Sequence, residues 1–410
     1  MNRIAVPLFL VLLVAGTASG WLGPYQLTFD DSADVNVSAC KEFLPGRITC
    51  MVWQTNRNGN WDIYSRFCHI WRGNGWEDEL PVCVDSVDDI HPVVTCHSDT
   101  WDTPTFLCVW EGRTSPIIGE VWAAQATYPD SWSEPTRIGR VLHTAGDSGH
   151  PSVVSIRNYE CDDSTFVVWC EHDTDGSYIS YTVFDGDTWA EPGIAVASPA
   201  RIRSARIGRR GRYWDYLPLL VWEQEGDICY SEYQSGQWTT PLQVAPHGTH
   251  DANPDVISVG YTFMGGFGTW IVWESTRDGD TAVYKTANDT FSIGRRMCDS
   301  VGAGRNSCPV GTEITFTTEY DALVAAWVSD RRGNPDIYSC LGWFDYDYCV
   351  DSSPASDLNP VIASLENWGE QMGWVLWQSD RNGNWDIYGS FFHNTGVEEN
   401  GARAGDGLRL

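Results

Sequence analysis

Acidic and imidazole side chains gather in short polar segments, each of which precedes a new apolar run. The members with the best spacing for a common site are Asp89, His91, Asp147, His150 and Asp251. Carboxylates and imidazoles that converge can bind a divalent cation or hydrogen-bond a polar ligand. The alternative is local, because Asp, Asn and Ser in such loops often hydrogen-bond their own backbone. We predict that any cation or polar-ligand site of this chain uses these residues.

Oxygen-bearing side chains also alternate along the segment 379-SDRNGNWDIY-388. They are Asp380, Asn382, Asn384 and Asp386. Hard oxygen ligands at every second position can wrap a short loop around Ca²⁺, although this segment lacks the distal bidentate Glu of an EF-hand loop. A structural role competes with this interpretation, in which Arg381 pairs with Asp386, and Arg57 with Asp62, across a hairpin. No cofactor is certain, and Ca²⁺ is the candidate ion.

Tryptophan is the other residue type that could meet a ligand. Trp61 and Trp385 lie beside predicted exposed turns, where an indole ring could stack against a sugar. Other tryptophans recur at regular intervals along the chain. A residue that recurs in every unit is expected to pack in the core, where an indole buries a large apolar area.

Established catalytic motifs are not convincingly placed in this sequence, whether a nucleophile elbow, an HExxH helix, a phosphate loop or a CxxC pair. Glu111, Glu223 and Glu274 each follow a recurring Trp and could pair as glycosidase carboxylates do. Their repetition argues against catalysis, since an active site is asymmetric. The sequence therefore favours an exported, non-catalytic binding or scaffold protein whose partner is an unknown protein or a glycan. A carbohydrate-active enzyme, either a glycoside hydrolase or a polysaccharide lyase, is the alternative.

A repeated unit must position these residues. An apolar-Trp step marks seven copies of it, at Trp53, Trp110, Trp169, Trp222, Trp273, Trp327 and Trp377. The best-kept copies continue with apolar β-formers around a short Asn-Gly, Arg-Gly or Asp-Gly turn, as a β-hairpin does. A further aromatic strand and a His-Pro or Asn-Pro step bring the unit to four strands. Seven such antiparallel units, without helical periodicity, predict an all-β, seven-bladed β-propeller.

The two ends of the repeated region complement each other. Residues 21–28, WLGPYQLT, have the form of a fourth strand without a preceding blade, whereas the copy after Trp377 lacks its fourth strand. We predict that residues 21–29 complete the last blade, beside the strand around Asp386 to Phe392. Such closure would remove a free sheet edge. The propeller is expected to span residues 21–395.

The hairpin segments 379-SDRNGNWDIY-388, 329-SDRRGNPDIY-338 and 55-TNRNGNWDIY-64 resemble TolB-type propeller repeats. The resemblance covers all seven units but is weak in the middle ones. It implies the propeller fold and says little about activity, because this scaffold carries many functions. Sialidase-like propellers are a second, weaker relative, since their S-x-D-x-G-x-x-W box does not occur in register.

The two ends of the sequence and its net charge indicate where the protein is located and which partners it can bind. Residues 1–20 have the cation, apolar run and small residues of a secretory signal peptide, and residues 396–410 read as a flexible tail. We expect an exported monomer in the periplasm, outside the cell or at its surface, without a transmembrane segment. The net charge of −29 disfavours nucleic acid. One basic run, residues 201–212, is interpreted as an elaborated loop or a docking site for carboxylates.

Thirteen cysteines in an exported chain predict disulfides. Twelve fall into near neighbours that would join adjacent antiparallel strands. The predicted pairs are Cys40 with Cys50, Cys68 with Cys83, Cys96 with Cys108, Cys161 with Cys170, Cys298 with Cys308, and Cys340 with Cys349. Cys229 has no such neighbour. The competing interpretation is that several cysteines are small buried thiols.

Overall fold

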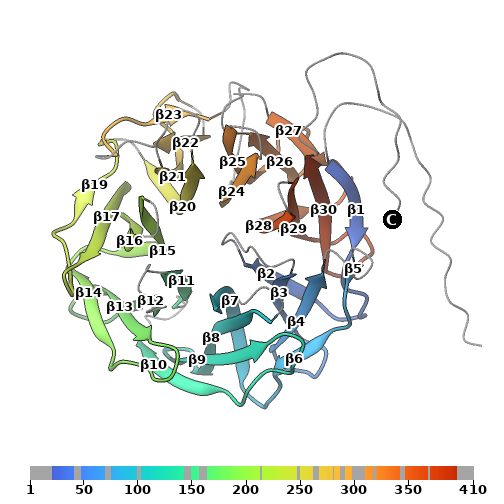
Figure 1. Ribbon diagram of the computed structural model, residues 1–410, viewed down its shortest axis with the longest axis horizontal. Coiled ribbons are helices and arrows are strands. Elements are labelled where there is room, and N and C mark those ends of the chain that lie inside the picture. Colours follow the sequence, from blue (N-terminus) through green and yellow to red (C-terminus); the bar gives the residue numbers. More distant parts are fainter. Residues whose placement is uncertain are drawn as a thin grey trace, which may run out of the picture.

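Seven small antiparallel sheets surround a central axis in the computed structural model (Figure 1). The structure describes residues 21–40, 48–69, 75–98, 103–142, 149–156, 164–212, 215–246, 250–261, 267–279, 281–286, 291–297, 310–316, 320–341, 347–367 and 370–394. This part of the chain contains no helix, and hence none that is long and apolar enough to cross a membrane. The predicted seven-bladed β-propeller is confirmed.

The first four blades follow one another along the chain. Blade one contains β2 (Asp34–Ala39), β3 (Ile48–Thr55), β4 (Asp62–His69), β5 (Gly75–Trp76) and β6 (Leu80–Cys83). Blade two contains β7 (Asp88–Ser98), β8 (Thr105–Ser115), β9 (Ile118–Thr127) and β10 (Thr136–Leu142). Blade three contains β11 (Ser152–Ile156), β12 (Ser164–His172), β13 (Ser177–Phe184) and β14 (Gly193–Ser198). Blade four contains β15 (Ile202–Arg212), β16 (Asp215–Gln224), β17 (Asp227–Gln234), β18 (Gln237–Trp238) and β19 (Leu242–Gln243).

The last three blades complete the ring. Blade five contains β20 (Asp251–Tyr261), β21 (Phe267–Ser275), β22 (Ala282–Thr286) and β23 (Arg295–Arg296). Blade six contains β24 (Val310–Phe316), β25 (Tyr320–Ser329), β26 (Asp336–Leu341) and β27 (Asp347–Asp351). Blade seven contains β28 (Asp357–Asn367), β29 (Glu370–Ser379), β30 (Asp386–Asn394) and β1 (Trp21–Gln26). The first strand of each blade lies nearest the axis (Figure 1).

The N-terminal strand closes the ring as predicted. β1 pairs antiparallel with β30, with Trp21 opposite Phe392 and Gln26 opposite Tyr388. The contact continues past β1, because the backbone N–H of Leu27 donates to the carbonyl oxygen of Ile387 at 2.8 Å. Leu27 is 5% exposed and packs in a core shared with blade one. Residues from the two ends of the described chain therefore build one sheet.

The seven recurring tryptophans are all less than 2% exposed. Each packs in an apolar cluster that also contains residues of the preceding blade. Trp110 of blade two, for example, lies with Ile63 and Phe67 of blade one, and Trp53 of blade one lies with Leu376 of blade seven. The repeat period therefore follows from packing, since each inter-blade layer buries one indole. Their predicted core role is confirmed.

A buried aspartate at the start of the inner strand supports these tryptophans in several blades. The indole Nε1 of Trp53 donates to Asp34 Oδ1 at 3.2 Å, and Arg57 of the hairpin lies 3.4 Å from the same oxygen. Arg381 pairs in the same way with Asp357 at 3.0 Å. This corrects the expected pairings of Arg381 with Asp386 and of Arg57 with Asp62. Each of these arginines pairs with the buried carboxylate at the start of its blade, and not with the aspartate across its own hairpin.

The strand register separates the predicted partners Cys68 and Cys83. Cys50, Cys68, Cys83 and Cys108 are thiols. Cys68 of β4 lies opposite Thr49 of β3. Cys83 of β6 lies opposite Ile63, which is five residues from Cys68 along β4. That offset is about 17 Å, far beyond the reach of a disulfide. Cys108 lies opposite Val94 and not opposite Cys96, whereas Cys40 does lie beside Cys50, with its N–H 3.1 Å from the Cys50 carbonyl oxygen.

Cys161, Cys298 and Cys308 lie outside the described residues, as does the side chain of Cys340. Cys229 is a half-buried thiol, as expected from its lack of a neighbour. The predicted signal peptide, residues 1–20, and the predicted tail, residues 396–410, also lie outside the described residues.

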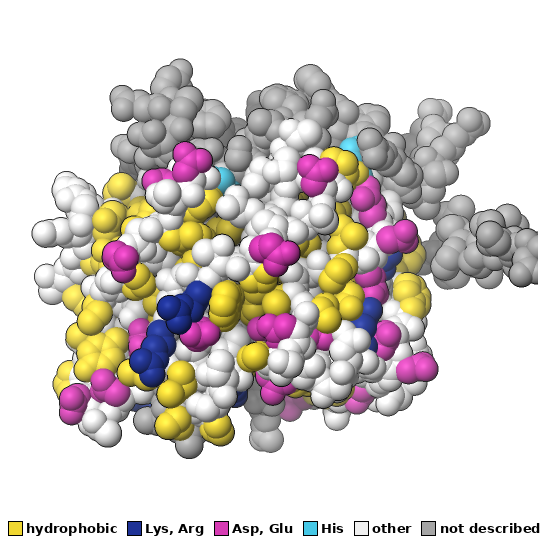
Figure 2. All heavy atoms as spheres, turned by 90° about the horizontal axis from the view of Figure 1, so that it is seen from below, with side chains coloured by type: hydrophobic (Ala, Val, Ile, Leu, Met, Phe, Trp, Pro, Cys, Tyr) yellow, Lys and Arg dark blue, Asp and Glu magenta, His cyan; other side chains and the backbone are white. Residues whose placement is uncertain are grey.

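The basic run at residues 201–212 forms the inner strand β15 and not a loop. Arg203 lies 3.6 Å from Glu223 of the adjacent strand, and Arg209 Nε donates to the Ser155 carbonyl oxygen of blade three at 2.6 Å. These partners within the protein explain how an inner strand accommodates so many cations. The surface carries the excess negative charge instead, and Figure 2 shows carboxylates spread over one side of the disc.

Candidate functional site

A ring of residues with left-handed backbone conformation surrounds one mouth of the axis. In the described inner strands and the segments just before them, these residues are Asn36, His91, His150, Ser204, Asn253 and Asn359, with φ between 40° and 54°. Asn and His tolerate this conformation better than most residues, which explains the recurring Asn-Pro and His-Pro steps. The pairing register shifts beside most of them, as at a β-bulge. Bulges re-aim side chains, and here they place one polar residue per blade at the mouth.

Hydrogen bonds link this ring from blade to blade. Gln54 follows the recurring Trp of blade one, and its Oε1 accepts the backbone N–H of His91 in blade two at 2.9 Å. Gln378 of blade seven accepts the N–H of Asn36 in blade one at 3.0 Å. Glu111 of blade two accepts the N–H of Gly149, just before His150, at 2.7 Å. In blades seven, one and two the residue after the Trp therefore holds the next blade, and this part of the mouth is pre-organised.

The two histidines of the ring contact each other. The ring centroids of His91 and His150 lie 4.1 Å apart. His150 retains exposed surface even though protein surrounds it on most sides, as expected for a side chain inside a channel mouth. This enclosure, reinforced by the charge of His91, lowers the pKa of His150 to about 3. His150 is therefore neutral at physiological pH, and its imidazole can both donate and accept a hydrogen bond.

Two carboxyl groups interact on the opposite arc of the ring. Burial raises the pKa of Glu274 to about 7, and the charge of Glu223 adds to this effect. Burial also raises the pKa of Glu223, against the opposing charge of Arg203. Glu274 Oε1 accepts a hydrogen bond from the ring residue Asn253 at 3.2 Å. Glu274 is therefore partly protonated near neutral pH.

The predicted site residues divide into two groups. His91 and His150 meet at the mouth, as expected for a shared site. Asp89 and Asp251 are each 2% exposed, and they bond within the blades instead, Asp89 to the Trp110 indole at 2.9 Å and Asp251 to Arg277 at 2.8 Å. Asp147 lies outside the described residues.

The predicted calcium ligands are already engaged in hydrogen bonds. Asn384 Nδ2 donates to the carbonyl oxygens of Asp30 and Ser32 at 2.9 and 3.0 Å, which holds the segment that leads into blade one. Asn60 of blade one makes the equivalent contact to the segment before blade two. The remaining members bond elsewhere: Asp380 accepts the Ser356 N–H, Asn382 donates to Tyr388, and Asp386 accepts from Gln26. These bonds account for the repeated Asn without an ion, and Ca²⁺ binding stays a prediction.

Trp61 and Trp385 are half-buried beside the same mouth. The carbonyl oxygen of Trp61 accepts the N–H of Asp89 at 2.8 Å, and that of Trp385 accepts the N–H of Asp34 at 2.7 Å. Their backbones are thus fixed to the first residues of the inner strands in the following blades. Both residues therefore lie next to the start of an inner strand.

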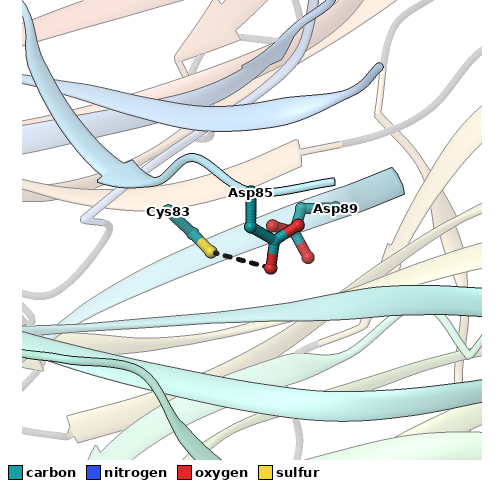
Figure 3. A group of neighbouring side chains, drawn as sticks. All are labelled: Cys83, Asp85 and Asp89. Atoms are coloured by element: carbon teal, nitrogen blue, oxygen red, sulfur yellow. Dashed lines mark hydrogen bonds between the residues drawn. The ribbon is translucent and has the colours of Figure 1, made fainter. Parts of the chain in front are cut away.

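A cluster that the sequence did not predict lies between blades one and two. One ligand atom from each of Cys83, Asp85 and Asp89 lies within 4.8 Å of the others (Figure 3). Burial raises the pKa of Asp89 to about 7, and the charges of Asp85 and Asp62 add to it. The signal was present in the Cys-x-Asp-x-x-x-Asp spacing, but it was obscured because Cys83 was expected to bridge Cys68.

The fold and the polar mouth together define a class, the seven-bladed β-propellers with a hydrogen-bonded axial ring. No protein-family model matches this chain, and no curated protein sequence matches it. AofleA from Arthrobotrys oligospora is structurally similar at a TM-score of 0.50, with 9% sequence identity over 78% of this chain and 87% of that chain.

Other solved structures are similar at lower scores. A fungal lectin of Aleuria aurantia, described as a six-bladed β-propeller with a novel fucose recognition mode, has a TM-score of 0.46 and 13% identity over 74% of this chain and 96% of its own. A putative TolB from Agrobacterium tumefaciens has a TM-score of 0.32 and 14% identity over 48% of this chain and 61% of its own. These similarities do not place the chain in the TolB family.

Proposed function

We propose that this chain is an exported binding propeller that takes a polar ligand, a glycan, at the axial mouth. The observation that carries the proposal is the contact between His91 and His150 within a ring fixed by inter-blade hydrogen bonds. Imidazole, amide and carboxylate groups supply donors and acceptors together, which suits a ligand whose hydroxyl groups do both. Trp61 and Trp385 at the rim would supply apolar faces beside these polar groups.

A substitution at the two histidines tests this proposal. His91→Asn and His150→Asn keep a residue suited to the left-handed backbone, because Asn253 and Asn359 occupy the equivalent positions of other blades. We expect each variant to weaken binding of the best glycan from an array by about tenfold or more, equivalent to about 1.4 kcal/mol. Titration calorimetry on the purified protein measures the affinity.

The matched control is Ser235→Asn, a similar change at an exposed left-handed residue in the turn between β17 and β18. It should leave the affinity unchanged, whereas Trp61→Ala and Trp385→Ala should lower it. Unaltered glycan affinity in both histidine variants would place the ligand elsewhere. Absence of glycan binding, with capture of a protein partner that His150→Asn abolishes, would retain the mouth and change the ligand class.

The alternative, a carbohydrate-active enzyme, is favoured by one observation, the Glu223–Glu274 pair. Glycoside hydrolysis needs one protonated and one ionised carboxyl group on opposite sides of the scissile bond. Glu274, with its pKa raised to about 7, would be the acid, and Glu223 would be the base or nucleophile.

Hydrolysis of a panel of polysaccharides separates the two functions. Under the enzyme hypothesis, Glu274→Gln and Glu223→Gln should each lower kcat by at least about 100-fold, and the rate of the unmodified protein should fall as Glu274 loses its proton above pH 7. Glu111→Gln is the control, because Glu111 occupies the same repeat position but bonds Gly149 and Arg113. Under the binding proposal, no hydrolysis is expected from any of these proteins.

A further inference from the structure

We propose that Cys83, Asp85 and Asp89 form a metal site that binds Zn²⁺ at the junction of blades one and two. This site lies apart from the His91–His150 pair and does not depend on the proposed glycan binding. Cys83 is the last residue of β6, Asp85 lies in the connection that follows, and Asp89 is the second residue of β7. The short connection between two blades therefore supplies all three groups.

The geometry is close to that of a bound metal. Cys83 Sγ lies 4.0 Å from Asp85 Oδ2, and the three ligand atoms lie within 4.8 Å of one another (Figure 3). A tetrahedral zinc ion, with Zn–S near 2.3 Å and Zn–O near 2.1 Å, separates such ligands by about 3.6 Å. Small side-chain rotations are enough to close the difference.

Asp89 supplies an independent indication that a cation belongs here. It is 2% exposed, and Oδ1 accepts the Trp110 indole N–H at 2.9 Å. Oδ2 is buried and accepts no hydrogen bond from a nitrogen or hydroxyl donor of the described chain; the group beside the carboxylate is the Cys83 thiol, a weak donor. A buried carboxylate oxygen with so weak a donor beside it is costly, and the charged groups nearest to it, Asp85 and Asp62, have the same sign.

Blade two lacks the arginine that lies beside the equivalent aspartate in other blades. The residues equivalent to Asp89 each have a guanidinium partner: Asp34 has Arg57 at 3.4 Å, Asp251 has Arg277 at 2.8 Å, and Asp357 has Arg381 at 3.0 Å. These arginines stand four residues after the recurring Trp. In blade two that position is Thr114, whose hydroxyl donates to the Ile118 carbonyl oxygen. A bound cation would replace the absent arginine.

The ligand chemistry selects the ion. A thiolate with two carboxylates suits the borderline-soft Zn²⁺ better than Ca²⁺ or Mg²⁺, which prefer oxygen ligands alone. Three protein ligands leave a fourth position for water. Asp85 is exposed and Cys83 is half-buried, so solvent can reach the site. Binding would release the thiol proton, because only the thiolate is a metal ligand.

Metal titration of the purified protein tests the proposal. We expect calorimetry to give one Zn²⁺ per chain at this site, and Co²⁺ to give the near-ultraviolet absorption of a thiolate–cobalt bond. Cys83→Ser should remove that absorption and weaken Zn²⁺ binding by at least about tenfold, as loss of a ligand or its support does. Asp89→Asn should weaken binding as well, and circular dichroism checks that this variant, which alters a buried group, is folded.

Cys229→Ser is the matched control, since Cys229 is also a half-buried thiol with a nearby carboxylate, Asp227. It should leave both signals unchanged. Zn²⁺ should also raise the melting temperature of the unmodified protein and of Cys229→Ser, but not that of Cys83→Ser. Absence of the cobalt–thiolate absorption from the unmodified protein would overturn the proposal, as would its persistence in Cys83→Ser.

Discussion

A protein that begins at residue 30 instead of residue 21 is expected to lose roughly 3–5 kcal/mol of its free energy of unfolding, because it loses a buried Leu and exposes the edge of a sheet. β1 supplies the outer strand of blade seven, and Leu27 and Thr28 behind it are 5% and 0% exposed. Chemical denaturation of the two proteins measures the difference.

Two point variants separate packing from strand pairing in this result. Leu27→Ala alone should cost about 2–4 kcal/mol, whereas Leu22→Ala, at a side chain that is 45% exposed, should cost less than about 1 kcal/mol. A synthetic peptide of residues 21–29, added to the truncated protein, should raise its melting temperature. Equal stability of the long and short proteins would show that the ring does not need this strand.

Arg277→Met is expected to cost about 3–5 kcal/mol, because it leaves the buried carboxylate of Asp251 without its counter-charge. The two side chains are only 7% and 3% exposed, and Arg277 also lies 4.6 Å from the ring centroid of Tyr284. Burial already raises the pKa of Asp251 while Arg277 lowers it, so the variant raises that pKa further. The folded variant then binds a proton that the unfolded chain has released, and its stability should fall as the pH rises from 4 to 7.

Thermal melts of three further proteins complete the test. Asp251→Asn combined with Arg277→Met should recover part of the loss, since no unpaired charge remains. Arg137→Met removes an ion pair with Glu120 whose arginine is 61% exposed, and it should cost less than about 0.5 kcal/mol. A loss below 1 kcal/mol in Arg277→Met, without pH dependence, would contradict the view that these buried pairs hold the hairpins to the inner strands.

The fold could be predicted from the sequence because the repeat reflects one packing event per blade. Trp53 and its six counterparts recur because each indole fills the layer against the preceding blade. The closing strand was predictable for the same reason, since WLGPYQLT matched a strand that only the last copy lacked. Both inferences depend on the order of residues within one repeated unit, and this order is visible in the sequence because it recurs in each copy.

The site was less predictable because contacts between blades depend on register. Sequence proximity suggested a bond between Cys68 and Cys83, yet pairing on β4 separates them by five residues. Asp89 lies only two residues before His91, but a bulge turns the histidine to the mouth while Asp89, like Asp251 of blade five, bonds within its blade. The Glu223–Glu274 pair depends on two blades meeting, which no local motif encodes.

The register of the closing strand also determines how the ring responds to tension. Because Trp21 lies opposite Phe392, the start of β1 and the end of β30 emerge from the same end of the blade. A force that pulls these two points apart loads the hydrogen bonds of this ladder one after another, as in a zipper, and not all together in shear. The propeller should therefore open at blade seven under a small mechanical load while the other six sheets remain folded.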